Sequence, residues 1–287
     1  MDHYSASLSN AQVLLISCRD RKGLISHISR VLYENDLNII SNREFVDSEK
    51  NRFYMRTEFT GIIRDKRSFL KGIKENLPSD ANVKLPDNKK KKVVVLATKE
   101  HHCLAELLIR NFYSDLNINI QAVISNHNKL EDFVNKFHIP YHFLSHEGKT
   151  KKEHEQEINR ILTGYEFDYL ILAKYMRILS PEFVQDLAEK IINIHHSFLP
   201  AFAGANPYHQ AYQRGVKIIG ATAHFVTSEL DQGPIIVQDT KNIDHTYEVN
   251  DIKRAGRDME TLTLMKAIQL VTEDRVFVNG NKTIIFS

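Results

Sequence analysis

A chain of 287 residues is long enough for one large domain or two smaller ones. Its 42% hydrophobic and 26% charged residues are ordinary for a soluble globular protein, and a net charge of +2 excludes a dominant nucleic-acid or membrane surface. Because the first ten residues are polar and no apolar stretch reaches transmembrane length, we expect a cytoplasmic protein. Its two cysteines, far apart in the sequence, fit neither a disulfide nor a metal pattern.

The N-terminal part of the chain predicts a βαββαβ order. An apolar strand over residues 12–18 leads into a polar turn in which Gly23 relaxes the backbone, and apolar residues then recur at helical spacing over 24–32. The next elements are strands over residues 37–46 and 51–59, a helix over 69–77 and a short strand over 82–85. This order is typical of a ferredoxin-like fold, an antiparallel sheet with two helices on one face.

Two short motifs in this part resemble a known module, the ACT domain. They are Asp20-Arg-Lys-Gly-Leu-Ile25 at the strand-to-helix turn and Asn38-Ile39 at the start of the next strand. The resemblance implies an ACT-like regulatory or dimerisation domain over residues 1–86, with an amino acid such as glycine or methionine as its effector. Pairing of such domains implies a homo-oligomer, a dimer or a tetramer. Effector binding and dimerisation alone are equally consistent with the pattern.

A lysine-rich segment, residues 87–92, is interpreted as a linker to a second domain over residues 93–287. The β-branched run 93–97 is typical of a parallel strand covered on both faces. Strands and helices then alternate, which predicts a doubly wound, mostly parallel, Rossmann-like α/β sheet. The further strands are expected over residues 118–124, 141–144, 169–173 and 191–194, and the helices over 104–112, 130–137, 158–162 and 181–187.

Beyond these elements the alternation stops. A loop rich in glycine, alanine and proline is followed by two strands, over about 217–226 and 234–239, and by a long helix through 262–270. Residues 276–286 predict a closing hairpin with Asn279-Gly280 as its turn.

The candidate catalytic groups are an amide, an imidazole and a carboxylate. Alternation along the strand places Asn193 and His195 on one face and His196 on the other. Asp231 follows in an acidic turn after the strand 217–226. Together these three groups can act in acid/base catalysis and oxyanion stabilisation. Taken singly, His195 also fits a hydrogen-bonded core histidine and Asp231 a solvated carboxylate.

Metal binding is the rival explanation, because three histidines, His195, His196 and His224, are available as ligands. The first two are expected on opposite faces, and no metal-ligand spacing occurs, so we predict no metal site. His224 is expected either to orient the catalytic groups or to pack near them.

Four polar segments leave the carboxyl ends of the predicted strands, where ligands bind in such sheets: residues 98–103, 125–127, 174–179 and 195–197.

These spaced motifs resemble the folate-dependent formyltransferase superfamily. The resemblance is carried by Asn193-Ile-His195-x-Ser197-x-Leu199-Pro200, Ala223-His-Phe-Val226, Asp231-x-Gly233 and the segment Lys174-Tyr-Met-Arg-Ile-Leu179. An ACT-like module ahead of such a domain, and the string Gly204-Ala-Asn-Pro-Tyr208, are similar to the formyltetrahydrofolate deformylase family.

The resemblance implies an activity and roles for the residues. The expected reaction is hydrolysis of 10-formyltetrahydrofolate to tetrahydrofolate and formate, which balances one-carbon folate pools and supplies formate for purine synthesis. The Asn193 amide and protonated His195 are expected to stabilise the oxyanion. Asp231 is expected to position and deprotonate water, with no cofactor. The expected folate contacts are Met176, Arg177, Leu179, Val226 and Ser228.

One departure separates this sequence from the related transformylases. Where those enzymes carry a Gly- and Ser-rich loop for the acceptor's phosphate, this chain has Lys99-Glu-His-His-Cys103. Its bulky side chains and Glu100 oppose phosphate binding, which favours water as the acceptor. His196 also stands where transformylases commonly have proline. Formyl transfer to an amine through this loop, and a catalytically idle folate or amino-acid sensor, are the alternatives.

Overall fold

The computed structural model describes residues 11–200 and 207–286. The polar residues 1–10 lie outside the described residues. So do residues 204–206 of the string that ends at Tyr208.

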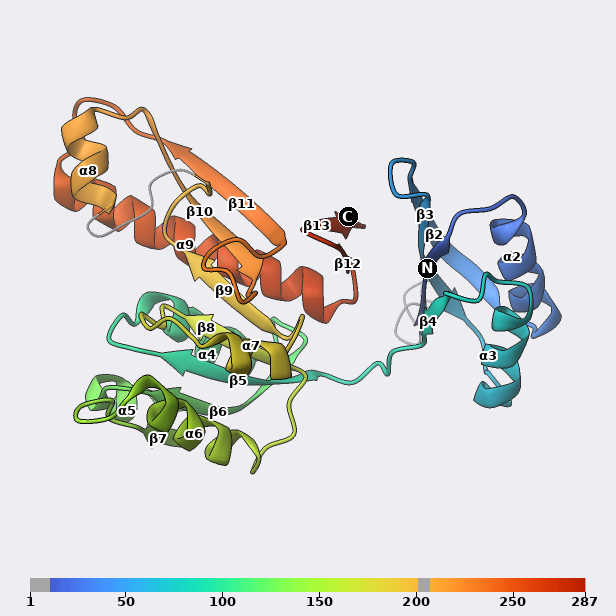
Figure 1. Cartoon of the computed structure of the whole chain (residues 1–287), viewed down its shortest axis with the longest axis horizontal. Coiled ribbons are helices and arrows are strands. Elements are labelled where there is room, and N and C mark those ends of the chain that lie inside the picture. Colours follow the sequence, from blue (N-terminus) through green and yellow to red (C-terminus); the bar gives the residue numbers. More distant parts are fainter. Residues whose placement is uncertain (1–10, 201–206, 287) are drawn as a thin grey trace, which may run out of the picture. The chain divides into compact units, whose positions relative to one another are not determined.

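The chain divides into two compact units (Figure 1). The first comprises the described residues up to Lys89 together with Asp274–Phe277 and the residues from Ile284 onward. The second comprises Lys90–Glu273 and Val278–Thr283. Among the described residues, no helix has the length and apolar character needed to cross a membrane.

The first unit is an antiparallel sheet with strand order β2-β3-β1-β4. Apolar residues of its two helices, such as Ile28 and Phe69, are buried against Leu14 and Phe59 of the sheet. Gly23, with a φ of 93°, is the N-cap of the first helix. The predicted βαββαβ order is therefore confirmed. The elements are β1 (Gln12–Arg19), α2 (Leu24–Glu34), β2 (Asn38–Asp47), β3 (Arg52–Thr60), α3 (Lys66–Glu75) and β4 (Asn82–Lys84).

The second unit is built on a seven-stranded sheet with order β11-β10-β9-β8-β5-β6-β7. Strands β5 to β9 pair in parallel, and β10 and β11 add to the edge in antiparallel fashion. The predicted, mostly parallel α/β sheet is confirmed. Its strands are β5 (Lys91–Ala97), β6 (Ile118–Ser125), β7 (Tyr141–Phe143), β8 (Tyr169–Ala173), β9 (Ile191–His195), β10 (Ile218–Phe225) and β11 (Ile235–Asn242).

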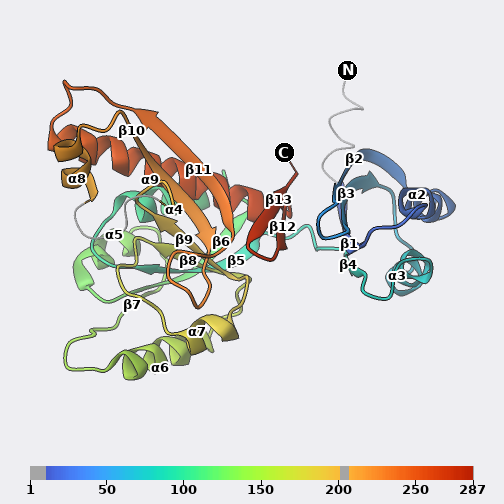
Figure 2. The ribbon, with the colours of Figure 1, turned by 45° about the horizontal axis from the view of Figure 1, so that its top comes forward.

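Helices cover both faces of this sheet (Figure 2). On one face, Ile158 and Phe183 pack against Leu170 and Leu172 of β8. On the other face, α9 contacts β9, β10, β11 and α4. The first pair of helices is α6 (Lys151–Leu162) and α7 (Pro181–Asp186), and the second is α4 (His102–Tyr113) and α9 (Val249–Thr272).

Local differences from the sequence predictions have simple causes. The helix expected over 130–137 is a 3₁₀ turn, Asn128–Leu130, followed by the short helix α5 (Glu131–Asn135). Helix α8 (Pro207–Arg214) was missed, because the glycine, alanine and proline just before it favoured a continuous loop. The closing hairpin is confirmed, but its turn comes one residue later than predicted, because Asn279 ends the first strand and Gly280, with a φ of 65°, begins the turn. Its strands are β12 (Val276–Asn279) and β13 (Lys282–Ile285).

Candidate active site

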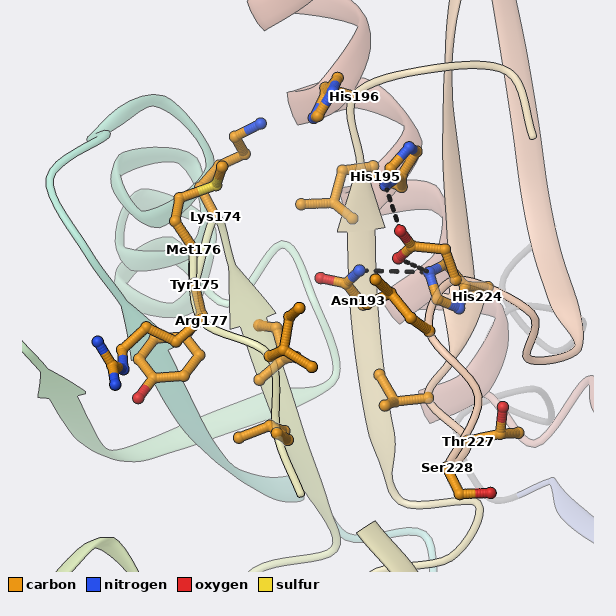
Figure 3. A pocket seen from close by; sticks show the side chains of 17 residues that line it. Lys174, Tyr175, Met176, Arg177, Asn193, His195, His196, His224, Thr227 and Ser228 are labelled. Carbon is orange, nitrogen blue, oxygen red and sulfur yellow. Dashed lines mark hydrogen bonds and ion pairs between the residues drawn. The ribbon is translucent and has the colours of Figure 1, made fainter. Parts of the chain in front are cut away.

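Strand β9 places Asn193 beside His224. The two residues face each other directly in the antiparallel register of β9 and β10, so their side chains project on the same face. Asn193 Nδ2 lies 3.2 Å from His224 Nε2 (Figure 3). The sheet itself therefore brings together an amide from one strand and an imidazole from the next.

The protonation of His224 orients this amide. Burial lowers the pKa of His224, whose side chain is 1% exposed, so the ring is neutral at neutral pH. Its Nδ1–H donates to the Phe225 carbonyl at 2.9 Å. Nε2 therefore carries the lone pair and accepts from Asn193 Nδ2. His224, expected to orient the catalytic groups or to pack near them, thus contacts Asn193 directly.

Asp231 reaches His195 because the loop after β10 folds back. Since β10 is antiparallel to β9, its last residue, Phe225, pairs with Ile192 rather than with the end of β9. The returning loop brings Asp231 Oδ2 to 3.4 Å from His195 Nδ1. Gly233 is required for this fold-back, since a Cβ there would lie 1.7 Å from the Phe225 carbonyl oxygen.

The electrostatics of Asp231 favour its charged form. The hydrogen bond with His195 lowers the pKa of this carboxyl below 3.8, against the opposing effect of partial burial, and the nearby imidazoles lower it further. With the carboxylate as acceptor, His195 Nδ1 is the donor. His195 Nε2 is buried and has no hydrogen-bond partner among the described residues. A substrate atom can therefore bind at this nitrogen.

His196 lies on the same side of the site as His195, contrary to the sequence prediction. The two rings stack with centroids 4.6 Å apart and planes 23° from parallel, and both line one pocket. Strand alternation fails here because β9 ends at His195, so the backbone no longer directs the next side chain to the opposite face. Burial, with the Lys174 ammonium and the His195 ring nearby, lowers the pKa of His196 to about 4.

All nine predicted site residues line a single pocket of about 350 Å³. It lies between the segment from Lys174 to Arg177 on one side and Asn193, His195 and His224 on the other (Figure 3). Met176, which is 61% exposed, and Leu230, 59% exposed, place apolar surface at the pocket. The nine are Asn193, His195, Asp231, His224, Met176, Arg177, Leu179, Val226 and Ser228.

The sheet edge contributes to the pocket only in part. Of the four polar segments expected there, 174–179 and 195–197 supply lining residues, whereas 98–103 and 125–127 do not. Residue Thr98 instead supports the lining, because its Oγ1 accepts a hydrogen bond from the Met176 amide at 3.1 Å.

Sequence reasoning missed a charged cluster next to the pocket. Lys174 Nζ, in the pocket wall, lies 3.0 Å from Oε1 of Glu260, a residue of α9 that is 1% exposed. No local pattern links residues so distant in sequence. The same carboxylate, with His102 and Cys103, forms a group of three potential metal ligands within the described residues. We assign no metal to it, because the Lys174 ammonium already occupies the carboxylate and would repel a cation.

Comparisons with known proteins agree with this geometry. A formyl transferase family model matches residues 91–268, and an ACT domain model matches residues 12–67. Formyltetrahydrofolate deformylase of Haemophilus influenzae is 50% identical over 274 residues, covering 96% of this chain and 98% of that one. The crystal structure of a formyltetrahydrofolate deformylase from Pseudomonas syringae superposes with a TM-score of 0.92 at 38% identity, covering 99% and 98% of the two chains.

A related enzyme matches only the second part of the chain. The glycinamide ribonucleotide transformylase 1 structure from Symbiobacterium toebii has a TM-score of 0.66 at 26% identity, and covers 72% of this chain and 98% of its own. The deformylases, in contrast, match along the full length, including the ACT domain. This chain belongs to the formyltetrahydrofolate deformylase family.

Proposed function

We propose that this chain is an enzyme that hydrolyses 10-formyltetrahydrofolate to tetrahydrofolate and formate. The observation that carries the proposal is the full-length match to deformylases of a chain whose Asn193, His195 and Asp231 line one pocket. A match to the formyl transferase part alone would equally fit transfer to an amine. The ACT unit and the bulky segment 98–103 distinguish this chain from transformylases.

Asn193 and His195 stabilise the negative charge that forms on the formyl oxygen. One N–H of the Asn193 amide is held by His224, which directs the second toward the substrate. His195 uses its Nδ1–H for Asp231, so the second donor is the Nε2–H of the protonated ring, whose positive charge the Asp231 carboxylate stabilises. Fixed donors at a developing oxyanion lower the barrier because they need no reorganisation during the reaction.

Asp231 positions and deprotonates the attacking water. Its low pKa keeps it an acceptor at neutral pH, and His195 holds one of its oxygens. The water oxygen bonds to the formyl carbon, and the bond from that carbon to the folate nitrogen breaks. The proton taken by Asp231 passes to the departing nitrogen, so the step requires only water and these side chains.

The folate binds along the remaining pocket lining. The apolar side chains of Met176, Leu179 and Val226 contact the ring system, and Arg177 and Ser228 supply polar contacts. Apolar walls with a few placed polar groups are what a ligand of this size requires.

Acceptor-free turnover tests the function. The full chain is incubated with 10-formyltetrahydrofolate and water as the only nucleophile, and formate is measured against time. Formate release that is lost in Asp231→Asn supports hydrolysis. Turnover that begins only when an amine is added indicates formyl transfer, and the absence of both reactions indicates a binding protein.

We also propose that the ACT unit binds a small amino acid, glycine or methionine, and that the chain forms a dimer or tetramer. The support is the match of residues 12–67 to the ACT domain family and the four-stranded antiparallel sheet that this unit forms. Isothermal titration of the full chain with each amino acid tests the effector, and no heat with either would refute it. Light scattering that gives the mass of one chain would refute the oligomer.

A further inference from the structure

Glu260 is the centre of a buried polar network that the hydrolysis mechanism does not use. Its carboxylate is 1% exposed and accepts three hydrogen bonds. Lys174 Nζ at 3.0 Å and the Tyr208 hydroxyl at 2.6 Å donate to Oε1, and His102 Nε2 lies 2.6 Å from Oε2. A buried carboxylate so fully engaged fixes the side chains that bind it.

Glu260 stays charged and its hydroxyl partner stays protonated. Burial raises the pKa of Glu260, but the hydrogen bond from His102, the Lys174 ammonium and the Tyr208 hydroxyl together lower it to about 2. Burial and the nearby carboxylate raise the pKa of Tyr208 far above its ordinary value. Around neutral pH the network therefore holds one arrangement of charges and donors.

The first side chain that Glu260 fixes belongs to the pocket. Lys174 directly follows β8, lines the pocket and has a left-handed φ of 59°, a conformation that a lysine rarely adopts. Its side chain is only 9% exposed, so the ammonium depends on Glu260 for its counter-charge. The carboxylate thus sets where this positive charge lies in the pocket wall.

The second side chain that Glu260 fixes is Tyr208, whose ring contacts His196. Tyr208 lies against α9 at Gly256, where a Cβ would come within 2.2 Å of the ring. From there its ring lies 6.4 Å, between centroids, from that of His196, which stacks on the catalytic His195. Tyr208 and His196 also share the lining of a second, smaller cavity behind the pocket.

Lys174 and His196 together form what we term the end wall of the pocket, next to His195. Both line the pocket, whereas Glu260 and Tyr208 lie behind them. Figure 3 shows both wall residues at the same end of the site, far from Ser228. The Glu260 carboxylate therefore holds both residues of the end wall. It holds Lys174 through an ion pair and His196 through the ring of Tyr208, whose hydroxyl donates to it.

We propose that Glu260 is a specificity-determining positioning residue, which holds the end wall closed so that water, and not an amine, reaches the formyl carbon. The proposal rests on the proposed hydrolytic function. A wall held in one position limits the room beside His195, which disfavours a nucleophile larger than water. Water is smaller than any amine with a substituent, so a fixed wall does not hinder it.

Loosening the wall should admit hydroxylamine, a small neutral amine. Its nitrogen would bond to the formyl carbon as the bond to the folate nitrogen breaks. The proton lost by the amine would pass to the folate nitrogen, giving formohydroxamate and tetrahydrofolate. Formate and formohydroxamate, measured in the same reaction, give the share of formyl groups diverted from water.

The test compares Glu260→Gln with Asp258→Asn, a control that removes an exposed carboxylate from the same helix. Each full-length protein is incubated with 10-formyltetrahydrofolate, with and without hydroxylamine. We expect Glu260→Gln to raise the diverted share about tenfold, which corresponds to about 1.4 kcal/mol of lost discrimination. The control should match the wild type. A purely structural role would lower both products together and leave the share unchanged.

Tyr208→Phe provides a second variant should Glu260→Gln fail to fold. It removes one hydroxyl from the network, and we expect a smaller rise in the diverted share, with Tyr212→Phe, a half-exposed tyrosine of the same helix, as its control. Equal shares in wild type and both variants would overturn the inference while leaving hydrolysis intact. The absence of formate from the wild type without hydroxylamine would overturn the proposed function as well.

Discussion

His195 Nδ1 lies 3.4 Å from Asp231 Oδ2, although the two residues come from different segments, the end of β9 and the loop after β10. The contact places a proton on Nδ1 of the imidazole, because an ionised carboxylate can only accept a hydrogen bond and the facing nitrogen must donate it. It also determines the state of the carboxyl, whose pKa this bond lowers. Each group thus prepares the other for its proposed role.

Replacing Asp231 by asparagine should abolish most of the activity. The side chain keeps its size, but it can neither take the proton of water nor stabilise a charged His195. General base catalysis commonly contributes on the order of 10²–10⁴ in rate, and we expect a loss in that range for formate release. Unchanged turnover in a folded Asp231→Asn protein would exclude Asp231 as the base.

The same substitution should change how stability depends on pH. Because the folded pKa of Asp231 lies below its unfolded value of 3.8, the charged form stabilises the fold at every pH well above that value. This contribution is lost as the pH falls through the folded pKa. Urea unfolding should therefore show the wild type more stable than Asp231→Asn near neutral pH, with the difference shrinking as the pH falls below 3.8 and through the lowered pKa of the folded state. A difference independent of pH would contradict the lowered pKa.

Much of the fold was predictable because its determinants are local. Alternation in the strands and helical spacing of apolar residues identified both sheets, and the β-branched run 93–97 indicated the parallel core. That Asn193, His195 and Asp231 would share a site was predicted by the resemblance to the formyltransferase superfamily more than by any local pattern. In the structure, the register of β9 against β10 and the folded-back loop after β10 bring them together.

The parts that were not predictable depend on contacts distant in sequence or on where an element stops. His196 was assigned to the wrong face because the end of β9 could not be located to a single residue. Glu260 appeared to be one more polar residue of a long helix, since its partners, Lys174 and Tyr208, come from other elements. Such a network becomes visible only when the packing of α9 against the sheet is known.

Asn193→Ala should give a slow but folded enzyme. Removing one oxyanion donor typically costs about 3 kcal/mol of barrier, so kcat should fall on the order of 10²- to 10³-fold. The side chain contacts His224 at the edge of the pocket, so unfolding by urea should change little. A fall in kcat of less than about threefold would argue that the amide does not contact the oxyanion.

Gly233→Ala should disrupt the site without touching a catalytic group. The added Cβ would lie 1.7 Å from the Phe225 carbonyl oxygen, so the loop that carries Asp231 must move. We expect a loss of about 1–3 kcal/mol in stability and a larger loss in activity. Gly72→Ala is the control, because a Cβ there would meet only the Val31 side chain, at an ordinary contact distance of 3.5 Å. Equal activity of the two variants would show that the loop tolerates displacement.

The ion pair between Lys174 and Glu260 should show strong coupling in a double-mutant cycle. Lys174→Met leaves a buried carboxylate without its cation, whereas Glu260→Gln leaves a buried ammonium without its anion. Each single substitution should lower the free energy of unfolding by about 3–5 kcal/mol. The double variant removes both charges, so it should cost clearly less than the sum. The exposed pair Arg254 and Asp251 on the same helix provides the control cycle.

The two cycles should give different coupling energies, because the side chains of one ion pair are buried and those of the other are exposed. The control side chains are 74% and 42% exposed, so water screens their attraction and their coupling should be about 0–1 kcal/mol. Urea unfolding midpoints, measured where the m-value is unchanged, give the free energy of unfolding of the wild type, the single variants and the double variants. Additive losses for Lys174 and Glu260 would mean that Glu260 acts through Tyr208 or His102 alone. The proposed control of Lys174 by this carboxylate would then be wrong.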